Sequence, residues 1–172
     1  METTNFNNLL LQTAFCCMAC DGEIAPEEVK LIKSECELLP ALQNVDFSTE
    51  INKFVSDFNA DSKKFFKIYF EILEHNVADL TEQNELDLLD FAIRVIKADE
   101  KIEYSEVKFF KTIRYRLKVS DNRIISYFSG SVEDIELFLG EDIHTTISIA
   151  DITQQYLDTI KFEVLNRLDI NQ

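Results

Sequence analysis

The chain has 172 residues, of which 46% are hydrophobic, so it suits a folded domain with a substantial core and is not a disordered tail. It contains only three glycines and two prolines, which leaves few chain breakers and favours long helices over a many-turned sheet. The 32 acidic and 17 basic residues give a formal net charge of −15, which repels phosphate backbones and anionic lipid surfaces. We therefore expect no nucleic-acid partner, and regard cations or basic protein surfaces as the better candidates.

An apolar stretch near the N-terminus, residues 9–20, imitates a short signal region. The segment before it contains Glu2 and no Lys or Arg, so we expect neither a signal peptide nor a lipid attachment. No apolar run approaches the roughly 20 residues that a membrane-spanning helix needs. We expect a cytoplasmic protein without membrane insertion.

Helices are predicted on both sides of the first acidic segment. Apolar residues recur with helical spacing in residues 6–20, and this helix is predicted to end near Asp21 and Gly22, because Gly can take a left-handed conformation. Pro26 suits the first position of a second helix, where its missing N–H group would be unpaired in any case. Pro40 would stop that helix.

The cysteines all lie in the first quarter of the chain: Cys16, Cys17, Cys20 and Cys36. Cys17 and Cys20 have C-x-x-C spacing, but a zinc site would need further ligands, and no second pair or nearby His exists. A redox motif of this spacing is expected at the start of a helix rather than at its end. We therefore predict buried thiols that act as small core residues.

Two more helices are predicted between residues 48 and 77. Ser48 is a suitable N-cap for the first of them and Asp61 for the second. The second helix carries the most aromatic stripe of the chain, so we expect it to be central in the fold. Its Phe residues at helical spacing are interpreted as core rather than as a ligand site.

The second half repeats the helical pattern. Thr81 opens a helix that leads to Ala98, and residues 107–117 continue on the helix after it. Ser120 can cap a short helix that Gly130 closes.

Beyond the first 130 residues the pattern weakens. Residues 133–139 suit a short helix, residues 146–149 have strand-like alternation, and residues 154–168 are again amphipathic. We therefore divide the chain into a helical domain, residues 1–130, and a C-terminal extension, residues 131–172. The last helix of the extension is expected to dock on this domain or on a partner, such as a second copy.

One pattern occurs twice and organises the chain. Residues 20–29 and 98–107 both contain D-x-x-I-x-x-x-E-V, with an offset of 78 residues between Asp21 and Asp99. Each copy lies between two apolar-periodic segments, so each is predicted to be the turn of a helix hairpin. The predicted fold class is all-α: two related helix hairpins joined by a two-helix insert, with the C-terminal segment appended.

The repeated turns are rich in carboxylates. The second copy holds Asp99 and Glu106, but lysines are interleaved with its acidic residues. The first copy holds four carboxylates with no Lys or Arg among them: Asp21, Glu23, Glu27 and Glu28. A hard divalent ion such as Ca²⁺ takes about six to eight oxygen ligands, and carboxylates on both sides of a tight turn could supply some of them. Because no Lys or Arg is interleaved with its carboxylates, the first turn is the better candidate cation site. Its spacing differs from that of an EF-hand.

The same residues also have a purely structural interpretation. Asp21 and Asp99 can accept hydrogen bonds from N–H groups of their own loops, as in Asx turns. Glu28 and Glu106 can reach back to unpaired N–H groups at the starts of their helices. The sequence fits both a cation site and a set of turn and cap contacts.

The paired motifs, each at the end of an Ala-containing apolar helix and followed by Glu-Val, resemble the TerB-like family of tellurite-resistance proteins. That family is related to the N-terminal region of membrane-anchored J-domain co-chaperones, and the resemblance covers about residues 6–129. It implies an all-helical cytoplasmic module of chemical and metal stress responses, without a secure enzymatic activity and with acidic residues suspected of binding metal. The family's acidic positions fall on Asp21, Glu28, Asp99 and Glu106. Glu100 departs from the family's usual Asp-Gly.

Three classes of function follow from these observations. The first is a non-enzymatic module that binds a divalent cation at the acidic turns and signals to a protein partner. The second is a plain interaction scaffold, without metal, that uses its acidic surface or residues 154–168 to bind a partner or itself. The third, a metal-dependent hydrolase, is disfavoured because neither His75 nor His144 lies near a repeated turn. No triad or Gly-rich phosphate loop is present either, so we assign no catalytic residue.

Overall fold

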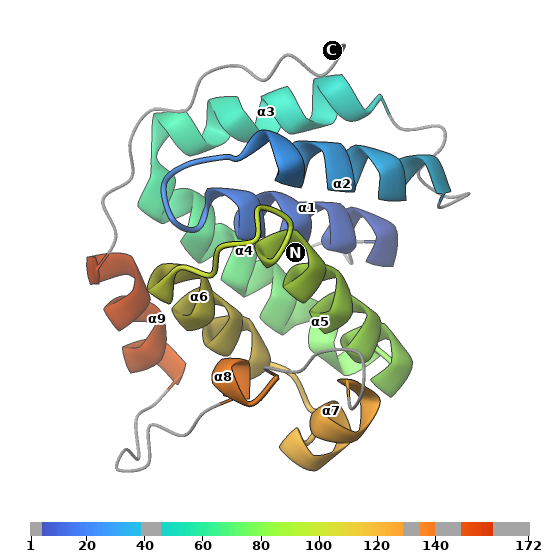
Figure 1. Cartoon of the computed structure of the whole chain (residues 1–172). Coiled ribbons are helices and arrows are strands. Elements are labelled where there is room, and N and C mark those ends of the chain that lie inside the picture. The colour runs from blue at the N-terminus through green and yellow to red at the C-terminus, as the bar shows by residue number, and fades with distance from the viewer. Residues whose placement is uncertain (1–4, 39–45, 129–134, 140–148, 160–172) are drawn as a thin grey trace.

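The structure is a computed structural model that describes residues 5–38, 46–128, 135–139 and 149–159 (Figure 1). Its helices are α1 (Phe6–Ala19), α2 (Pro26–Leu38), α3 (Phe47–Ala60), α4 (Ser62–Asn76), the 3-10 helix η2 (Val77–Asp79), α5 (Glu82–Ile96), α6 (Tyr104–Arg114), α7 (Asp121–Phe128), α8 (Ile135–Leu139) and α9 (Ile149–Thr159). No strand occurs within the described residues, which confirms the predicted all-α class. None of these helices is long and apolar enough to cross a bilayer.

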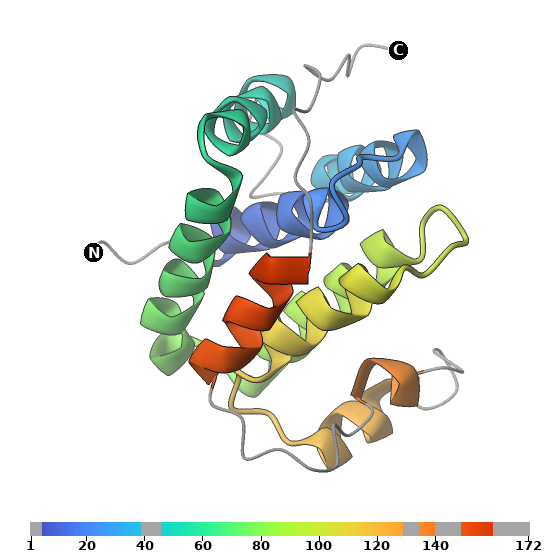
Figure 2. The same cartoon turned by 90° about the vertical axis from the view of Figure 1, so that its left-hand side faces the viewer.

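The two repeated segments are the turns of two helix hairpins, α1 with α2 and α5 with α6. α1 packs along α5, and further contacts join α2 to α5 and α1 to α6. Helices α3 and α4 come between the hairpins in the sequence and form a pair of their own, in which α4 contacts α1 and packs aromatic rings against α6 and α9. In both views the turn after α1 lies beside the turn after α5 (Figure 1 and Figure 2).

α1 is the central helix of the described part of the chain. From Leu9 to Cys20 every side chain except that of Gln12 is buried, and α1 contacts α2, α4, α5 and α6. α4 instead forms an outer wall, because Lys67 and Glu71 on its polar face are exposed. The prediction that α4 is central was therefore wrong. An aromatic stripe on one face marks a helix that is covered on that face, whereas α1 is apolar all round.

α9 covers an aromatic cluster formed by α4 and α6. The ring of Tyr156 lies 5.5 Å from that of Phe66 and 5.4 Å from that of Phe109, between centroids. Its hydroxyl donates to the carbonyl oxygen of Cys20 at 2.9 Å, so α9 is attached to the end of α1. Figure 2 shows α9, in red, lying along α6.

The boundaries of α9 differ from the sequence prediction. The helix begins at Ile149, so the strand indicated by the alternation over residues 146–149 is wrong at Ile149. Residues 146–148 lie outside the described part. The predicted helix over residues 154–168 is confirmed up to Thr159, and residues 160–168 lie outside the described part. For the short helix predicted over residues 133–139, the described part begins at Ile135.

Two of the predicted N-caps are confirmed by hydrogen bonds to the backbone: Asp61 Oδ1 accepts from the N–H group of Lys64 at 3.0 Å, and Ser120 Oγ accepts from that of Arg123 at 3.2 Å. Thr81, where a helix was predicted to open, also caps α5, since its Oγ1 accepts from the N–H group of Asn84 at 3.0 Å. Pro26 begins α2 as predicted. The predicted stops at Pro40 and Gly130 fall on residues outside the described part.

The prediction that Ser48 caps α3 is wrong, because Asp46 caps this helix. The carboxylate of Asp46 accepts from the N–H group of Thr49 at 3.2 Å and from its hydroxyl at 2.7 Å. This pair of bonds places the start of the helix at Phe47, before the serine.

The four cysteines are free and buried, as predicted. Burial raises the pKa of the Cys16, Cys17 and Cys20 thiols well above the ordinary value, and raises the pKa of Cys36 to about 11. Because the thiolate is the reactive form, these thiols are poor nucleophiles at neutral pH.

Candidate functional site

The two repeated turns have the same backbone shape. After α1, Gly22 takes a left-handed conformation with φ of 87°, as predicted, and the N–H group of Glu23 donates to Asp21 Oδ1 at 2.9 Å. After α5, Glu100 takes the corresponding left-handed conformation with φ of 62°, and the N–H group of Lys101 donates to Asp99 Oδ1 at 3.0 Å. Both predicted Asx turns are therefore confirmed.

Glu28 and Glu106 lie one turn into the helices that follow, and both are buried with only 1% exposure. Glu28 Oε2 accepts from the N–H group of Ala25 at 3.3 Å, and Glu106 Oε2 accepts from that of Glu103 at 2.7 Å. These are the predicted contacts with otherwise unpaired N–H groups at the starts of α2 and α6. The backbone contacts thus explain why a carboxylate stands at each position.

The carboxylates of the two turns affect one another. Burial raises the pKa of Glu28 to about 9, and the charges of Asp21, Glu106 and Asp99 add to this rise. Burial likewise raises the pKa of Glu106 to about 8, helped by the charges of Asp21, Asp99 and Glu103. Both side chains are therefore mostly protonated at neutral pH. These charge effects link Asp21, Glu28, Asp99 and Glu106 across the two turns, and we call these four residues the acidic site.

The other predicted site residues lie at the edge of the acidic site or outside it. Glu23 is exposed, and its charge contributes to the raised pKa of Asp21, whose largest cause is burial. Glu27 is also exposed and lines an open groove between α2 and α5. Glu103 was missing from the predicted set, although its charge raises the pKa of both Asp21 and Glu106. Its place immediately before α6 was a sequence signal that could have included it.

The hydrogen bonds described above use one oxygen of each carboxylate in the acidic site. Within the described residues, no group of three or more His, Cys, Asp or Glu side chains is arranged as a set of metal ligands. The acidic site is thus four carboxylates bound to their own turns, and a cation would have to draw them together.

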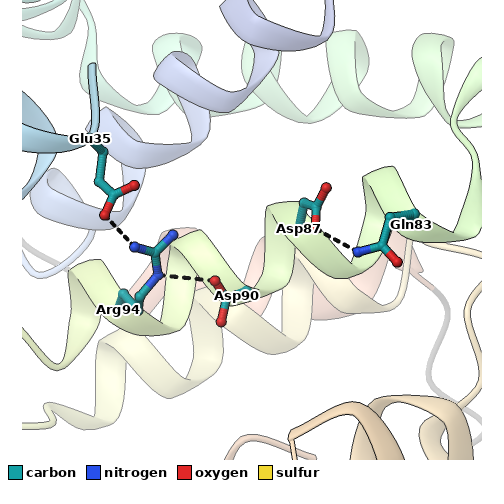
Figure 3. A network of polar contacts seen from close by, with 5 residues as sticks. All are labelled: Glu35, Gln83, Asp87, Asp90 and Arg94. Atoms are coloured by element: carbon teal, nitrogen blue, oxygen red, sulfur yellow. Dashed lines mark hydrogen bonds and ion pairs between the residues drawn. The ribbon is translucent and has the colours of Figure 1, made fainter. Parts of the chain in front are cut away.

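An ion-pair network fixes the first hairpin against α5 (Figure 3). Arg94 of α5 pairs with Glu35 of α2 and, at 3.0 Å, with Asp90 one turn earlier on its own helix. Nearer the start of α5, the side-chain amide of Gln83 donates to Asp87 at 2.7 Å. Because the Arg94 side chain is 42% exposed, these pairs orient the helices more than they stabilise the fold.

Comparisons of the chain with models of protein families, with curated proteins and with solved structures found no match. The resemblance of the repeated motif to the TerB-like family therefore stays a prediction. A proposal for the function has to be built on the geometry of the acidic site.

Proposed function

We propose that the chain is a non-enzymatic, cytoplasmic module of the TerB-like, stress-response type, which binds a divalent cation at the acidic site and signals this to a protein partner. The observation that supports this proposal is the electrostatic coupling of the two turns. Glu28 and Glu106 are buried, and the pKa of each is raised by the charges of both Asp21 and Asp99. Negative charges that disfavour the ionisation of two buried glutamates form a place where positive charge is favoured.

Burial and neighbouring negative charges now keep Glu28 and Glu106 protonated, and a bound cation would instead stabilise their charged form. Both would release a proton, because only the carboxylate form is a good ligand, so affinity should increase with pH. Both carboxylates also hold the N-terminal backbone of α2 and α6. A cation that draws these side chains together would therefore move or loosen the starts of two helices. This movement is the proposed signal to the partner.

Thermal melting with and without CaCl₂, MgCl₂, MnCl₂ or ZnCl₂ tests the proposal. At a concentration of about one hundred times Kd, a bound cation should stabilise the fold by about 2.7 kcal/mol, which is visible as a higher Tm. The double variant Asp21→Asn with Glu28→Gln should lose this response. The control, Glu23→Gln with Glu27→Gln, removes negative charge from exposed positions of the same segment and should keep it.

Two results would count against cation binding. One is a Tm of the unaltered protein that stays constant with all four ions. The other is a response that both double variants lose equally, because that would indicate general attraction of cations to an acidic surface.

The alternative function is a plain interaction scaffold without metal. It is favoured by the bonds that each carboxylate of the acidic site already makes to its own turn, and by two exposed apolar side chains, Leu38 at the end of α2 and Tyr104 at the start of α6. Both are 73% exposed, and large exposed apolar side chains are typical of contact surfaces. The partner would be a basic protein surface or a second copy.

Light scattering after size-exclusion chromatography tests self-association through these side chains. The variant Leu38→Ser with Tyr104→Ser should be monomeric where the unaltered chain is dimeric, and an unchanged mass would exclude both residues from a dimer interface. Truncation after residue 130 is a poorer test, since it would remove Tyr156 from the core together with any interface.

A further inference from the structure

A groove of about 620 Å³ lies between α3 and α4, and α1 contributes residues to its lining. This volume is within the range of about 300–1,000 Å³ that is typical of small-molecule sites. The groove is separate from the acidic site, because none of its lining residues belongs to either repeated turn. Figure 2 shows α3 and α4 meeting at a sharp bend beside α1.

The wall of the groove is apolar and aromatic. Phe54 of α3 and Phe65 of α4 are half-buried, with ring centroids 6.4 Å apart, and the ring of Phe15 lies 5.4 Å from both of them. Ile68 also lines the groove and is 43% exposed, although it stands between polar residues on the outer face of α4. Phe15 packs edge-to-face on Phe65 and tilted on Phe54, and these contacts fix the two rings while part of their surface stays open to a ligand.

Gln12 of α1 adds a polar group to this lining. Its Oε1 atom is buried and has no hydrogen-bond partner in the described part of the chain. The nearby hydroxyl groups are already committed: Thr13 Oγ1 donates to the carbonyl oxygen of Leu9 at 2.8 Å, so Tyr69 must donate its proton to Thr13 at 2.7 Å. A buried acceptor without a donor is unusual in folded proteins, and a ligand N–H or O–H group could supply the donor.

The rim of the groove is balanced in charge. It carries two basic and two acidic side chains: Lys53, Lys64, Asp57 and Asp61. In a chain of net charge −15, a rim with no net charge favours neither anions nor cations. The ligand should therefore be uncharged.

We propose that the α3–α4 groove binds a small uncharged amphiphile, whose ring or short apolar body packs on Phe54, Phe65 and Ile68 and whose N–H or O–H group donates to Gln12 Oε1. Apolar walls with a single placed polar group are typical of sites that fix a ligand's orientation. The proposal is independent of cation binding at the acidic site.

Indole and 1-methylindole are suitable probes, because they have nearly the same shape but only indole has an N–H donor. The chain contains no Trp, so the fluorescence of the probe can be followed without protein background in that range. Indole should bind roughly fivefold more tightly than 1-methylindole, the difference expected for one hydrogen bond of about 1 kcal/mol. Gln12→Leu should abolish this preference by removing the acceptor.

A second variant tests the groove without relying on Gln12. Ile68→Arg places a charged side chain on the exposed wall and should weaken both probes at least roughly tenfold. The matched control is Ile125→Arg on α7, since Ile125 is 37% exposed and outside the groove, and it should leave both affinities unchanged. The proposal would be overturned by the absence of saturable binding, by equal affinities of the two probes for the unaltered protein, or by equal effects of the two Arg variants.

Discussion

Glu28 and Glu106 are each subject to two opposing influences. The N–H group at the start of the helix stabilises the charged carboxylate, whereas burial and the neighbouring carboxylates destabilise it. The raised pKa values, about 9 and about 8, show that burial and repulsion outweigh the cap contact. Both side chains are therefore still protonated at neutral pH, although each accepts a hydrogen bond from the backbone at the start of its helix.

The first prediction concerns the pH dependence of stability. The pKa of Glu28 is about 9 in the folded chain against an ordinary value of 4.5, so the folded state binds the proton more tightly than the unfolded state between these values. Its contribution to stability is complete below the lower value and is lost as pH rises through the higher one. Glu28→Gln keeps the shape without the ionisation, so it should match the unaltered protein near about pH 4 and be more stable near about pH 9.

Urea unfolding across this pH range measures the difference between the two proteins. Glu27→Gln is the control, because Glu27 is exposed and its replacement should change stability by no more than about 0.5 kcal/mol at any pH. If the unaltered protein gains stability over Glu28→Gln as pH rises, Glu28 is ionised in the fold and the pKa assignment is wrong.

The second prediction concerns the left-handed residue of each turn. Glu100 adopts a φ of 62° where Gly22, in the equivalent place, adopts 87°. A left-handed conformation costs a residue with a Cβ atom about 1–2 kcal/mol. Gly avoids this cost, but its more flexible unfolded state offsets about 0.5–1 kcal/mol of the advantage. Glu100→Gly should therefore stabilise the fold by up to about 1 kcal/mol, and Gly22→Ala should destabilise it by about 1–2 kcal/mol.

Chemical denaturation at constant pH measures both changes. Because Glu100→Gly also removes a negative charge, Glu100→Gln serves as the control that removes the charge and keeps the strained backbone. Equal stabilisation by Gly and Gln would attribute the effect to charge, and would contradict the proposed strain.

At the scale of the elements, α9 shows how a helix can be evident in a sequence while its place in the fold is not. The spacing of Tyr156 and Leu157 predicted an amphipathic helix, which left docking on this domain and docking on a partner equally open. In the structure Tyr156 bonds to Cys20, 136 residues earlier, and its ring is 1% exposed. Such a contact depends on the shape of a finished core, which no local pattern encodes.

The third prediction tests the docking of α9. Tyr156→Phe keeps the ring but loses the bond to the Cys20 carbonyl, so it should cost about 1 kcal/mol. Tyr156→Ala also opens a cavity among Phe66, Phe70 and Phe109, and should cost about 3–5 kcal/mol.

Equilibrium unfolding in urea measures both costs. Gln155→Ala, at the exposed neighbouring position, should change stability by less than about 0.5 kcal/mol. If Tyr156→Ala costs no more than this control, α9 does not dock on the domain in solution.

Comparison of the elements shows which features the sequence could predict. The Asx turns, the reach-back of Glu28 and Glu106 and the cap at Asp61 join residues two or three positions apart, so residue type and spacing suffice to predict them. The central place of α1 and the meeting of the two turns depend on how helices far apart in the sequence pack. The repeat predicted two similar hairpins, but it could not predict that the charges of each turn act on the buried glutamate of the other.

For the whole molecule, the dominant electrostatic fact is the excess of negative charge, a formal −15. Ion pairs offset little of the repulsion that this charge causes, because pairs such as Arg94 with Asp90 and Arg123 with Glu82 lie at exposed positions, where each contributes about 0–1 kcal/mol. Self-repulsion should therefore outweigh the attraction within the pairs. Salt screens both the self-repulsion and the attraction within the ion pairs. Added salt therefore raises stability if the repulsion is larger, and lowers it if the attraction is larger.

The fourth prediction follows from this balance. Raising NaCl from about 0.01 M to about 1 M shortens the screening length from about 30 Å to about 3 Å, so it should raise the Tm by weakening self-repulsion. A Tm that falls would show that the exposed ion pairs dominate instead. CaCl₂ or MgCl₂ at matched ionic strength separates screening from binding, because screening depends on ionic strength alone whereas a cation in the acidic site adds its own stabilisation. A further rise in Tm with the divalent salt, absent from Asp21→Asn with Glu28→Gln, would therefore indicate binding between the two turns. Equal melting curves at equal ionic strength would leave the molecule an acidic helical bundle that responds only to screening.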